Sequence, residues 1–245
     1  MLLVIDAGNS FVKLAYHDGA AWREQRRVSL FDFAVAAHSM AQDAAPSGVI
    51  IANVAGERFQ GPMQALLAAW ACPVRWITAA PSGYGIVNGY AVPEQLGADR
   101  WAALIGLRRY TRKAAVLASV GTAVTIDVLS EQGRFAGGFI FPGLGLMREA
   151  LAQGTSGVGA ASGFFAPLPD NTADAVHSGT LLAVAGAIEK IFSAQRERAN
   201  GSPPELFITG GGAEAVASLI RPAPGIRSNL VLEGLLHIAH EERML

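Results

Sequence analysis

The chain has 245 residues, of which 51% are hydrophobic and 16% are charged, and its formal net charge at pH 7 is -1. This length and composition predict a globular protein with a large core, in one large domain or two small ones, and they exclude a disordered chain. The balanced charge gives no basic face for neutralising phosphates along a nucleic acid, and the single cysteine, Cys72, allows neither an intramolecular disulfide nor a cysteine metal cluster.

The first part of the chain alternates strand and helix patterns. Turn signals and apolar runs predict strands at Leu2–Asp6, Phe11–His17, Trp22–Ser29, Gly48–Asn53 and Val74–Thr78, and helices at Asp32–Asp43, Glu57–Ala71 and from Gly97 to about Arg112. The segment from Gly83 to Pro93 is rich in Gly, Asn, Tyr and Pro, so we expect a loop there.

The second part restarts the same pattern. It predicts strands at Ala114–Val120, Ala123–Leu129, Arg134–Ile140 and Leu206–Thr209, a helix after Pro142, a helix from the Asn171/Thr172 cap to Arg198, a helix after Gly212 and a last helix at Leu230–His240. A mobile loop is expected at Thr155–Asp170, and the Asn200–Pro204 segment is expected to stop the long helix. Two copies of one unit predict a duplicated α/β architecture, with domains at 1–113 and 114–245 and a ligand cleft between them.

Targeting signals are weak in this sequence. The N-terminus has no basic segment and its apolar run is too short for a signal peptide. Gly121 and several threonines interrupt the apolar stretch Lys113–Leu129, so we interpret it as buried strands rather than a membrane span. We therefore expect a cytoplasmic protein with neither membrane nor nucleic-acid partners.

Two strand-turn-strand segments carry the main chemical signal. In the first, a strand delivers Asp6 to the turn Gly8-Asn9-Ser10, and Lys13 follows on the next strand; in the second, a strand runs into Gly121-Thr122. Backbone N–H groups in such turns can cradle phosphate, and a carboxylate such as that of Asp6 can hold Mg²⁺. One such turn alone would favour an ordinary polar hairpin, whereas the pair favours a clamp for a polyphosphate.

Two further segments are open to both a structural and a functional reading. Gly210-Gly211-Gly212 could be a tight strand-to-helix turn or a platform for a purine or phosphate near a helix N-terminus. Asp99, in Gly97-Ala98-Asp99-Arg100, could be a helix cap, or it could accept a proton from a substrate hydroxyl, with Arg100 gripping an anionic group.

Together these segments resemble the type III pantothenate kinases over nearly the whole chain. The resemblance rests on Asp6–Ser10 with Lys13, Asn88-Gly89-Tyr90, Gly97–Arg100, Gly121–Asp127, Gly137–Gly143, Asn171-Thr172, Ser178-Gly179 and Thr209–Ala213. It implies the actin-like ATPase and sugar-kinase fold, with two ribonuclease-H-like domains around an ATP cleft, in a homodimer. It also implies ATP-dependent phosphorylation of pantothenate to 4′-phosphopantothenate, the first step of coenzyme A biosynthesis.

The resemblance also implies roles for individual residues. Asp99 is the expected proton acceptor, Tyr90, Gly97, Ala98 and Arg100 line the expected pantothenate site, and Thr172 is expected to reach the substrate from the partner subunit, near the interface. The nucleotide phosphates are expected to contact Asp6, Ala7, Gly8, Asn9, Ser10, Phe11, Val12, Lys13, Thr122, Gly211 and Gly212. Mg²⁺ accompanies ATP, with Asp6 as its expected protein contact.

One position departs from the family pattern. The family has an Asp shortly before the Gly-Thr turn and uses a monovalent cation, K⁺ or NH₄⁺, whereas this chain has Ser119 there. We expect the cation requirement to be weakened, or to be met by other oxygens. The alternatives are a non-catalytic nucleotide-binding regulator on the same fold, and a different kinase or phosphatase of this fold, such as a small sugar kinase. The retained Asp99 favours catalysis over the regulator, and the short chain and the Gly-Ala-Asp-Arg context disfavour the other kinase or phosphatase.

Overall fold

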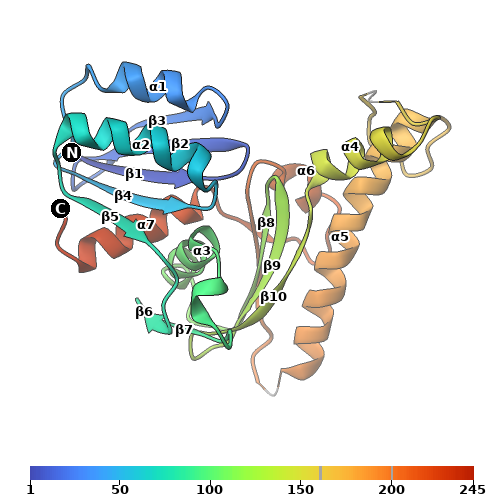
Figure 1. The fold of residues 1–245 in the computed structure, drawn as a ribbon. Helices are drawn as coiled ribbons and strands as arrows, with labels where there is room; N and C mark the ends of the chain where they lie inside the picture. The colour runs from blue at the N-terminus through green and yellow to red at the C-terminus, as the bar shows by residue number, and fades with distance from the viewer. Residues whose placement is uncertain (160–161, 200) are drawn as a thin grey trace. The chain divides into compact units, whose positions relative to one another are not determined.

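A computed structural model describes residues 1–159, 162–199 and 201–245. Contacts divide the chain into two compact units (Figure 1). The first unit contains Met1–Tyr110 together with Asn229–Leu245, and the second contains Thr111–Ser228. The second unit is therefore one continuous segment, inserted into the chain of the first.

The first unit is built on a five-stranded sheet with the strand order β3-β2-β1-β4-β5. Its elements, in chain order, are β1 (Leu2–Ala7), β2 (Phe11–His17), β3 (Trp22–Ser29), α1 (Phe33–Met40), β4 (Gly48–Asn53), α2 (Glu57–Trp70), β5 (Val74–Ile77), β6 (Ser82–Gly83), β7 (Ile86–Asn88), a 3-10 helix (Pro93–Gln95), α3 (Ala98–Arg108) and α7 (Leu230–Glu241). Strands β1, β2 and β3 form an antiparallel meander, whereas β4 and β5 continue the sheet in parallel with β1.

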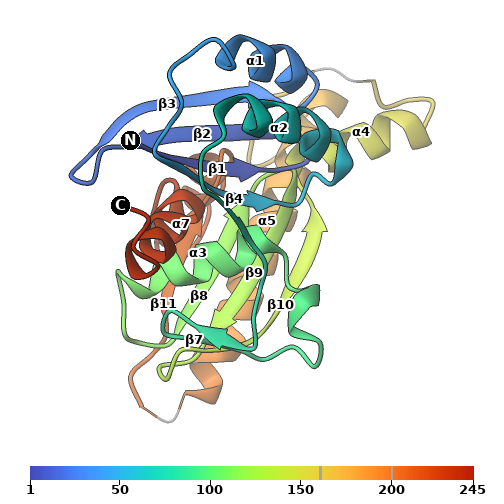
Figure 2. The same cartoon turned by 60° about the vertical axis from the view of Figure 1, so that its left-hand side comes forward.

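Helices cover both faces of this sheet. Side chains alternate between the faces of a strand, so Leu3, Ile5 and Ala7 of β1 point to the same face. There they pack in one cluster with residues of α1 and α2, such as Phe33 and Phe59. Figures 1 and 2 show α1 and α2 on that face, and α3 and α7 on the opposite face. Since β1 is covered on both faces, all six of its residues are buried.

Helix α7 returns to the first unit because it packs closely against α3. A Cβ atom at Gly234 would lie 1.8 Å from the carbonyl oxygen of Ala102, and one at Gly106 would lie 2.3 Å from the oxygen of Leu230. Only glycine permits this approach of two helix backbones. The compact units therefore differ from the sequence-based division at 113/114, since residues 229–245 lie with the first unit.

The strands of the second unit lie side by side in the order β12-β11-β8-β9-β10, as one part of a seven-stranded sheet. Its elements are β8 (Ala115–Val120), β9 (Ala123–Leu129), β10 (Arg134–Pro142), α4 (Leu144–Gly154), α5 (Thr172–Arg198), β11 (Glu205–Thr209), α6 (Ala213–Ala217) and β12 (Gly225–Ile226). Apolar residues of β8, β9 and β11 form one core cluster with α5 and α6. The unit repeats the meander that opens the first unit, with β8, β9 and β10 in antiparallel order.

Most of the predicted elements are confirmed, and the exceptions are short. The segment expected to be a loop from Gly83 to Pro93 begins in β6, contains β7 and ends at the first residue of the 3-10 helix. β6 and β7 pair with each other over only two positions. Helix α3 ends at Arg108 rather than near Arg112, and the two-residue strand β12 has no counterpart among the predicted elements. Residues 160–161 of the loop expected at Thr155–Asp170, and Asn200 of the expected helix stop, lie outside the described residues.

The apolar stretch Lys113–Leu129 forms β8 and β9, as the sequence indicates. By length and composition alone, α5 could cross a membrane. However, Leu181, Ile188 and Phe192 of α5 lie in the core cluster of the second unit. Because they pack on the sheet, we interpret α5 as a helix of the core rather than a membrane span.

Candidate active site

The first hairpin presents a carboxylate and an ammonium group side by side. Asp6 and Lys13 are directly opposite each other on β1 and β2, and a carboxylate oxygen of Asp6 lies 3.6 Å from Lys13 Nζ. In the turn between the strands, the N–H of Gly8 donates to the carbonyl oxygen of Phe11 at 3.0 Å. The turn thus holds Asn9 and Ser10 beyond the ends of the two strands.

Asp6 is electrostatically unusual. Burial raises the pKa of its carboxyl to about 6, although the charge of Lys13 acts in the opposite direction. The negative charge of Asp99 adds a smaller increase, and Val54 contacts both the end of β1 and Gly97 beside Asp99. The first unit therefore brings two predicted site residues together that are more than 90 positions apart in sequence.

Asp99 lies in the first turn of α3 and folds back over Gly97. The backbone N–H of Arg100 donates to its carboxylate at 2.8 Å, and a Cβ atom at position 97 would lie only 2.6 Å from that carboxylate. Glycine at 97 therefore leaves the space that the Asp99 side chain takes. Burial raises the pKa of the Asp99 carboxyl above its ordinary value, partly offset by the N–H and the charge of Arg100. A raised pKa makes this carboxylate a better proton acceptor.

Arg100 is buried and is bonded to Tyr90. Its Nη1 atom donates to the hydroxyl oxygen of Tyr90 at 3.1 Å. The loop of Tyr90 is held by Asn88, whose side-chain oxygen accepts from the N–H of Tyr90 and whose amide group donates to the oxygen of Pro93. Asn88 is thus a positioning residue for Tyr90, a role that the Asn-Gly-Tyr sequence motif does not itself reveal.

These groups gather at the carboxyl ends of two neighbouring parallel strands. β1 ends at Ala7, and the residue that follows β4, Val54, donates its N–H to the oxygen of Ala7 at 2.9 Å. The side chain of Val54 in turn lies 3.6 Å from a Cβ placed on Gly97. Ligand sites in α/β proteins form at such strand ends. The buried residue Ala98 belongs to the same corner.

The second hairpin has the same shape but different chemistry. In register, Ser119 lies opposite Thr125, just as Asp6 lies opposite Lys13 in the first hairpin. The N–H of Gly121 closes the turn on the oxygen of Ala123, and Thr122 is exposed at its tip. Neither a carboxylate nor an ammonium group occupies these two positions of the second hairpin.

Two of the three consecutive glycines pack against this second hairpin. A Cβ atom at Gly210 would lie 2.3 Å from the oxygen of Val120, and one at Gly212 would lie 2.6 Å from the Val120 side chain. Gly210 also has a φ of +98°, a conformation that other residues rarely adopt. A Cβ atom at Gly211 would have no atom within 4 Å, and the residue is exposed. Gly211 is therefore the glycine of the three that a ligand can approach.

Thr172 is exposed in the first turn of α5, in the second unit. The preceding residue, Asn171, caps the helix by accepting a hydrogen bond from the N–H of Asp174 at 3.0 Å. The local sequence therefore explains why the helix begins here. It leaves the Thr172 hydroxyl at the surface of the unit.

Comparisons with known proteins identify the family. A family model described as type III pantothenate kinase matches residues 2–194. A relative from Nitrosospira multiformis, named type III pantothenate kinase, is 39% identical over 241 residues, which is 98% of this chain and 92% of that protein. The chain belongs to the type III pantothenate kinase family.

Solved structures agree with this type III pantothenate kinase assignment at the level of the fold. A Campylobacter jejuni protein assigned to the Baf family of transcriptional activators has a TM-score of 0.62 and 21% identity, covering 99% of this chain and all of that one. A Sinorhizobium meliloti protein described as a 2-dehydro-3-deoxygalactonokinase has a TM-score of 0.62 and 16% identity, over all of both chains. The expected actin-like ATPase and sugar-kinase fold, with two sheets, is confirmed.

Type III pantothenate kinases act on ATP and use a divalent metal ion. In the part of the chain that the structure describes, no group of three or more His, Cys, Asp or Glu side chains could hold a metal ion. The Asp6 carboxylate nevertheless suits a Mg²⁺ ion that is bound to phosphate, because Mg²⁺ prefers oxygen ligands and takes few of them from the protein. The chemistry of the first hairpin therefore fits the kinase assignment.

Proposed function

We infer that the chain transfers the terminal phosphoryl group of ATP to the primary hydroxyl of pantothenate, giving 4′-phosphopantothenate. The observation that carries this inference is the half-buried Asp99 carboxylate at the start of α3, which is held by the N–H of Arg100 and lies over Gly97. Asp99 then accepts the proton of the acceptor hydroxyl, and Asp6 lies with the groups that would bind the phosphates. The non-catalytic alternative has no support from the curated relatives, which are named as kinases.

Asp99 is the group that accepts the proton. As the hydroxyl oxygen bonds to the terminal phosphorus, its proton passes to the Asp99 carboxylate, and the bond from that phosphorus to the bridging oxygen of ADP breaks. Burial favours this role because it raises the pKa of the carboxyl towards neutral pH. Arg100 and Tyr90, joined by a hydrogen bond, supply donors for the anionic acceptor, together with Gly97 and Ala98.

The phosphates of ATP bind at the two hairpins in this proposal. Asp6 to Lys13 supply backbone N–H groups and the ammonium group. In the second unit, Thr122 is the expected phosphate contact, and Gly211 and Gly212 are expected to contact the nucleotide. Asp6 would hold Mg²⁺ directly or through water, and the ion would supply charge stabilisation on the phosphates. Lys13 only partly compensates the Asp6 charge, since the pKa of that carboxyl stays raised, so a further cation is favourable there.

We also propose a homodimer in the cytoplasm, with Thr172 of one subunit reaching the substrate of its partner. The second unit exposes large apolar side chains near the start of α5, which is unusual for a monomer surface. These are Leu146, Leu151, Phe164, Phe165, Leu168 and Leu182. A second copy of the chain would cover such a surface.

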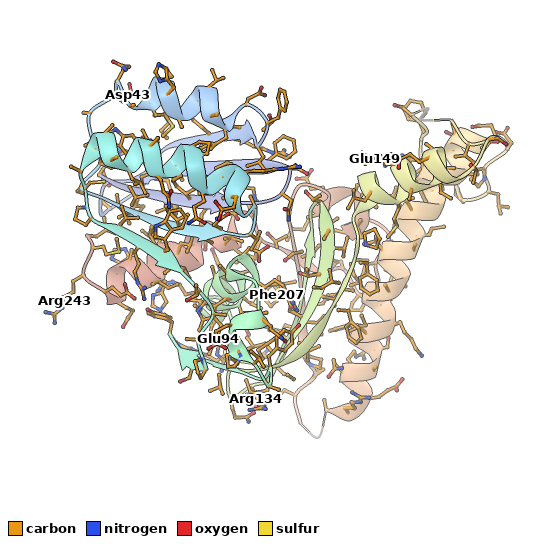
Figure 3. All side chains as sticks on the ribbon, viewed as in Figure 1. Asp43, Glu94, Arg134, Glu149, Phe207 and Arg243 are labelled. Carbon is orange, nitrogen blue, oxygen red and sulfur yellow. The ribbon has the colours of Figure 1, made fainter. Side chains whose placement is uncertain are left out.

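Replacing Asp99 with Asn tests the assignment. Asn keeps the size of the side chain but cannot accept the proton, so we expect pantothenate-dependent ADP formation to fall by roughly 10²-fold or more in turnover. Asp43→Asn is the matched control, since Asp43 is exposed beyond the end of α1 (Figure 3). No pantothenate-dependent ADP formation by the unmodified protein would refute the function, and near-normal turnover of Asp99→Asn would refute the base.

Ser119 leads to a separate proposal about monovalent cations. A serine hydroxyl is neutral, so the second hairpin lacks the carboxylate that the family uses beside its cation, and we expect little dependence on K⁺ or NH₄⁺. Turnover in sodium buffer should be within about 2-fold of turnover in potassium buffer, because Ser119 supplies no charged oxygen to hold a cation at the second hairpin. Strict potassium dependence would contradict this proposal.

A further inference from the structure

Strand β3 carries three arginines, and they differ in their partners. Arg23 pairs with Asp18, and Arg26 pairs with Glu24. Arg27 forms no ion pair within the part of the chain that the structure describes. Its guanidinium carbon instead lies 3.6 Å from the centre of the Phe11 ring. A guanidinium that stacks on a ring keeps its N–H edge available for a ligand in the plane of the stack.

Arg27 lies on the same face of the sheet as Asp6 and Lys13, the candidate contacts of the nucleotide phosphates. The strand register aligns Asp6 of β1 with Lys13 of β2, and Lys13 with Arg27 of β3. Residues directly opposite one another in an antiparallel pair point to the same face. Arg26 points to the other face, because its partner in register, Leu14, packs in the core cluster with α1 and α2.

The turn of the first hairpin is adjacent to this arginine. Phe11, on which Arg27 stacks, directly follows Ser10 of the turn. The end of β3 is also tied to the turn, because the N–H of Leu30 donates to the carbonyl oxygen of Ser10 at 2.9 Å. The Arg27 guanidinium therefore extends the row of polar groups formed by Asp6, Lys13 and the turn.

Lys13 and Arg27 violate a local rule of sheet stability. Like charges directly opposite each other on one face destabilise a sheet, and Asp6 is the only carboxylate among the three residues in this row. Positions that break such a rule are expected where the chain binds a ligand. An anion located between Lys13 and Arg27 would remove the repulsion.

We propose that Arg27 binds a phosphate group of the nucleotide, so that the phosphate site of the first hairpin extends onto β3. This proposal rests on the proposed kinase function, which supplies the nucleotide. A guanidinium donates two parallel hydrogen bonds to a phosphate, whereas Lys13 acts as a point charge beside it. The carboxylate of pantothenate is the other anion of the reaction, and the experiment separates the two.

The experiment compares Arg27→Gln, Arg27→Lys and the control Arg26→Gln in the full chain. Arg26→Gln removes the same charge from the neighbouring position on the opposite face. We expect Arg27→Gln to raise both the KM for MgATP and the inhibition constant of inorganic tripolyphosphate by about 10-fold, the order expected for one charge-assisted hydrogen bond. Arg27→Lys should lie between Arg27→Gln and the unmodified protein, and Arg26→Gln should change neither value more than about 2-fold.

The KM for pantothenate separates the two anions. It should stay unchanged in Arg27→Gln at saturating MgATP; a rise in that value, with MgATP and tripolyphosphate unaffected, would overturn the proposal. The unfolding temperature of Arg27→Gln should change little, because the repulsion from Lys13 and the stack on Phe11 are lost together. A fall in unfolding temperature with unchanged tripolyphosphate binding would mean that the Phe11 stack is only structural. Tripolyphosphate binding also tests Arg27 if pantothenate proves not to be the acceptor.

Discussion

At the scale of single residues, the buried carboxylate of Asp6 lowers the free energy of unfolding when it is ionised. Its burial raises the pKa from 3.8 to about 6, in spite of Lys13. The folded chain therefore binds more protons than the unfolded chain between about pH 4 and pH 6. Because of this one group, the free energy of unfolding falls as the pH rises through that window, and the destabilisation is fully present above pH 6.

Asp6→Asn should therefore stabilise the protein while it weakens nucleotide binding. At pH 7.5 we expect its free energy of unfolding in urea to exceed that of the unmodified protein by about 1–3 kcal/mol, since the buried charge is gone. The difference should shrink as the pH falls and approach zero well below pH 3.8, where the Asp6 carboxyl is protonated in both the folded and the unfolded chain. A variant that is less stable than the unmodified protein at pH 7.5 would show that the ion pair with Lys13 outweighs the burial.

Most residues of the candidate site are proposed from the sequence, because each stands in a recognisable local pattern. Asp6 ends an apolar strand and precedes a glycine turn, and Asp99 opens a helix after a glycine. Arg27 stands in no such pattern, because its position beside Lys13 depends on the register of β2 and β3. Register is a property of paired strands, and the arginines at 26 and 27 look equivalent in a single sequence.

At the scale of elements, the contact between α3 and α7 decides whether the site is held in place. Asp99 and Arg100 begin α3, and the middle of α3 packs against α7 through Gly106 and Gly234. The sequence predicts both helices from their apolar periodicity. It could not predict that they pack together, because the glycines that allow the contact are separated by more than 120 residues.

Gly234→Ala should therefore disrupt the first unit. The new methyl group would overlap the carbonyl oxygen of Ala102, so the helices must separate, and we expect a loss of about 2–4 kcal/mol in the free energy of unfolding. Gly186→Ala, in an exposed part of α5 with no neighbour within 4 Å of the new methyl group, is the control and should gain about 0.5–1 kcal/mol. Urea unfolding of both variants makes the comparison, and an equal effect of the two would refute the close contact.

At the scale of the whole molecule, the proposed dimer makes each site depend on two chains. If Thr172 acts on the partner's substrate, each site takes Asp99 from one chain and Thr172 from the other chain. A heterodimer of the variants Asp99→Asn and Thr172→Val would then contain one site with both residues intact. If Thr172 acts within its own chain, neither site of that heterodimer would be intact.

Co-expression of the two variants tests this arrangement. Each variant alone should be nearly inactive, whereas random pairing of the two should restore about a quarter of the normal turnover, because half of the dimers are mixed and each has one intact site. Turnover of the co-expressed mixture that equals the mean of the two separate variants would contradict a contribution from the partner.

The path of the chain also has a consequence for biosynthesis. The second unit is one continuous segment, whereas the first is completed only by residues 229–245. A ribosome delivers residues in order, and domains fold as their segments emerge. The second unit can thus form while the face of β1 that α7 will cover is still bare. The part of the first unit that contains Asp6 and Asp99 is complete only when α7 has been synthesised and has packed against α3. The second unit can therefore finish folding before the first, although the first unit begins earlier in the sequence.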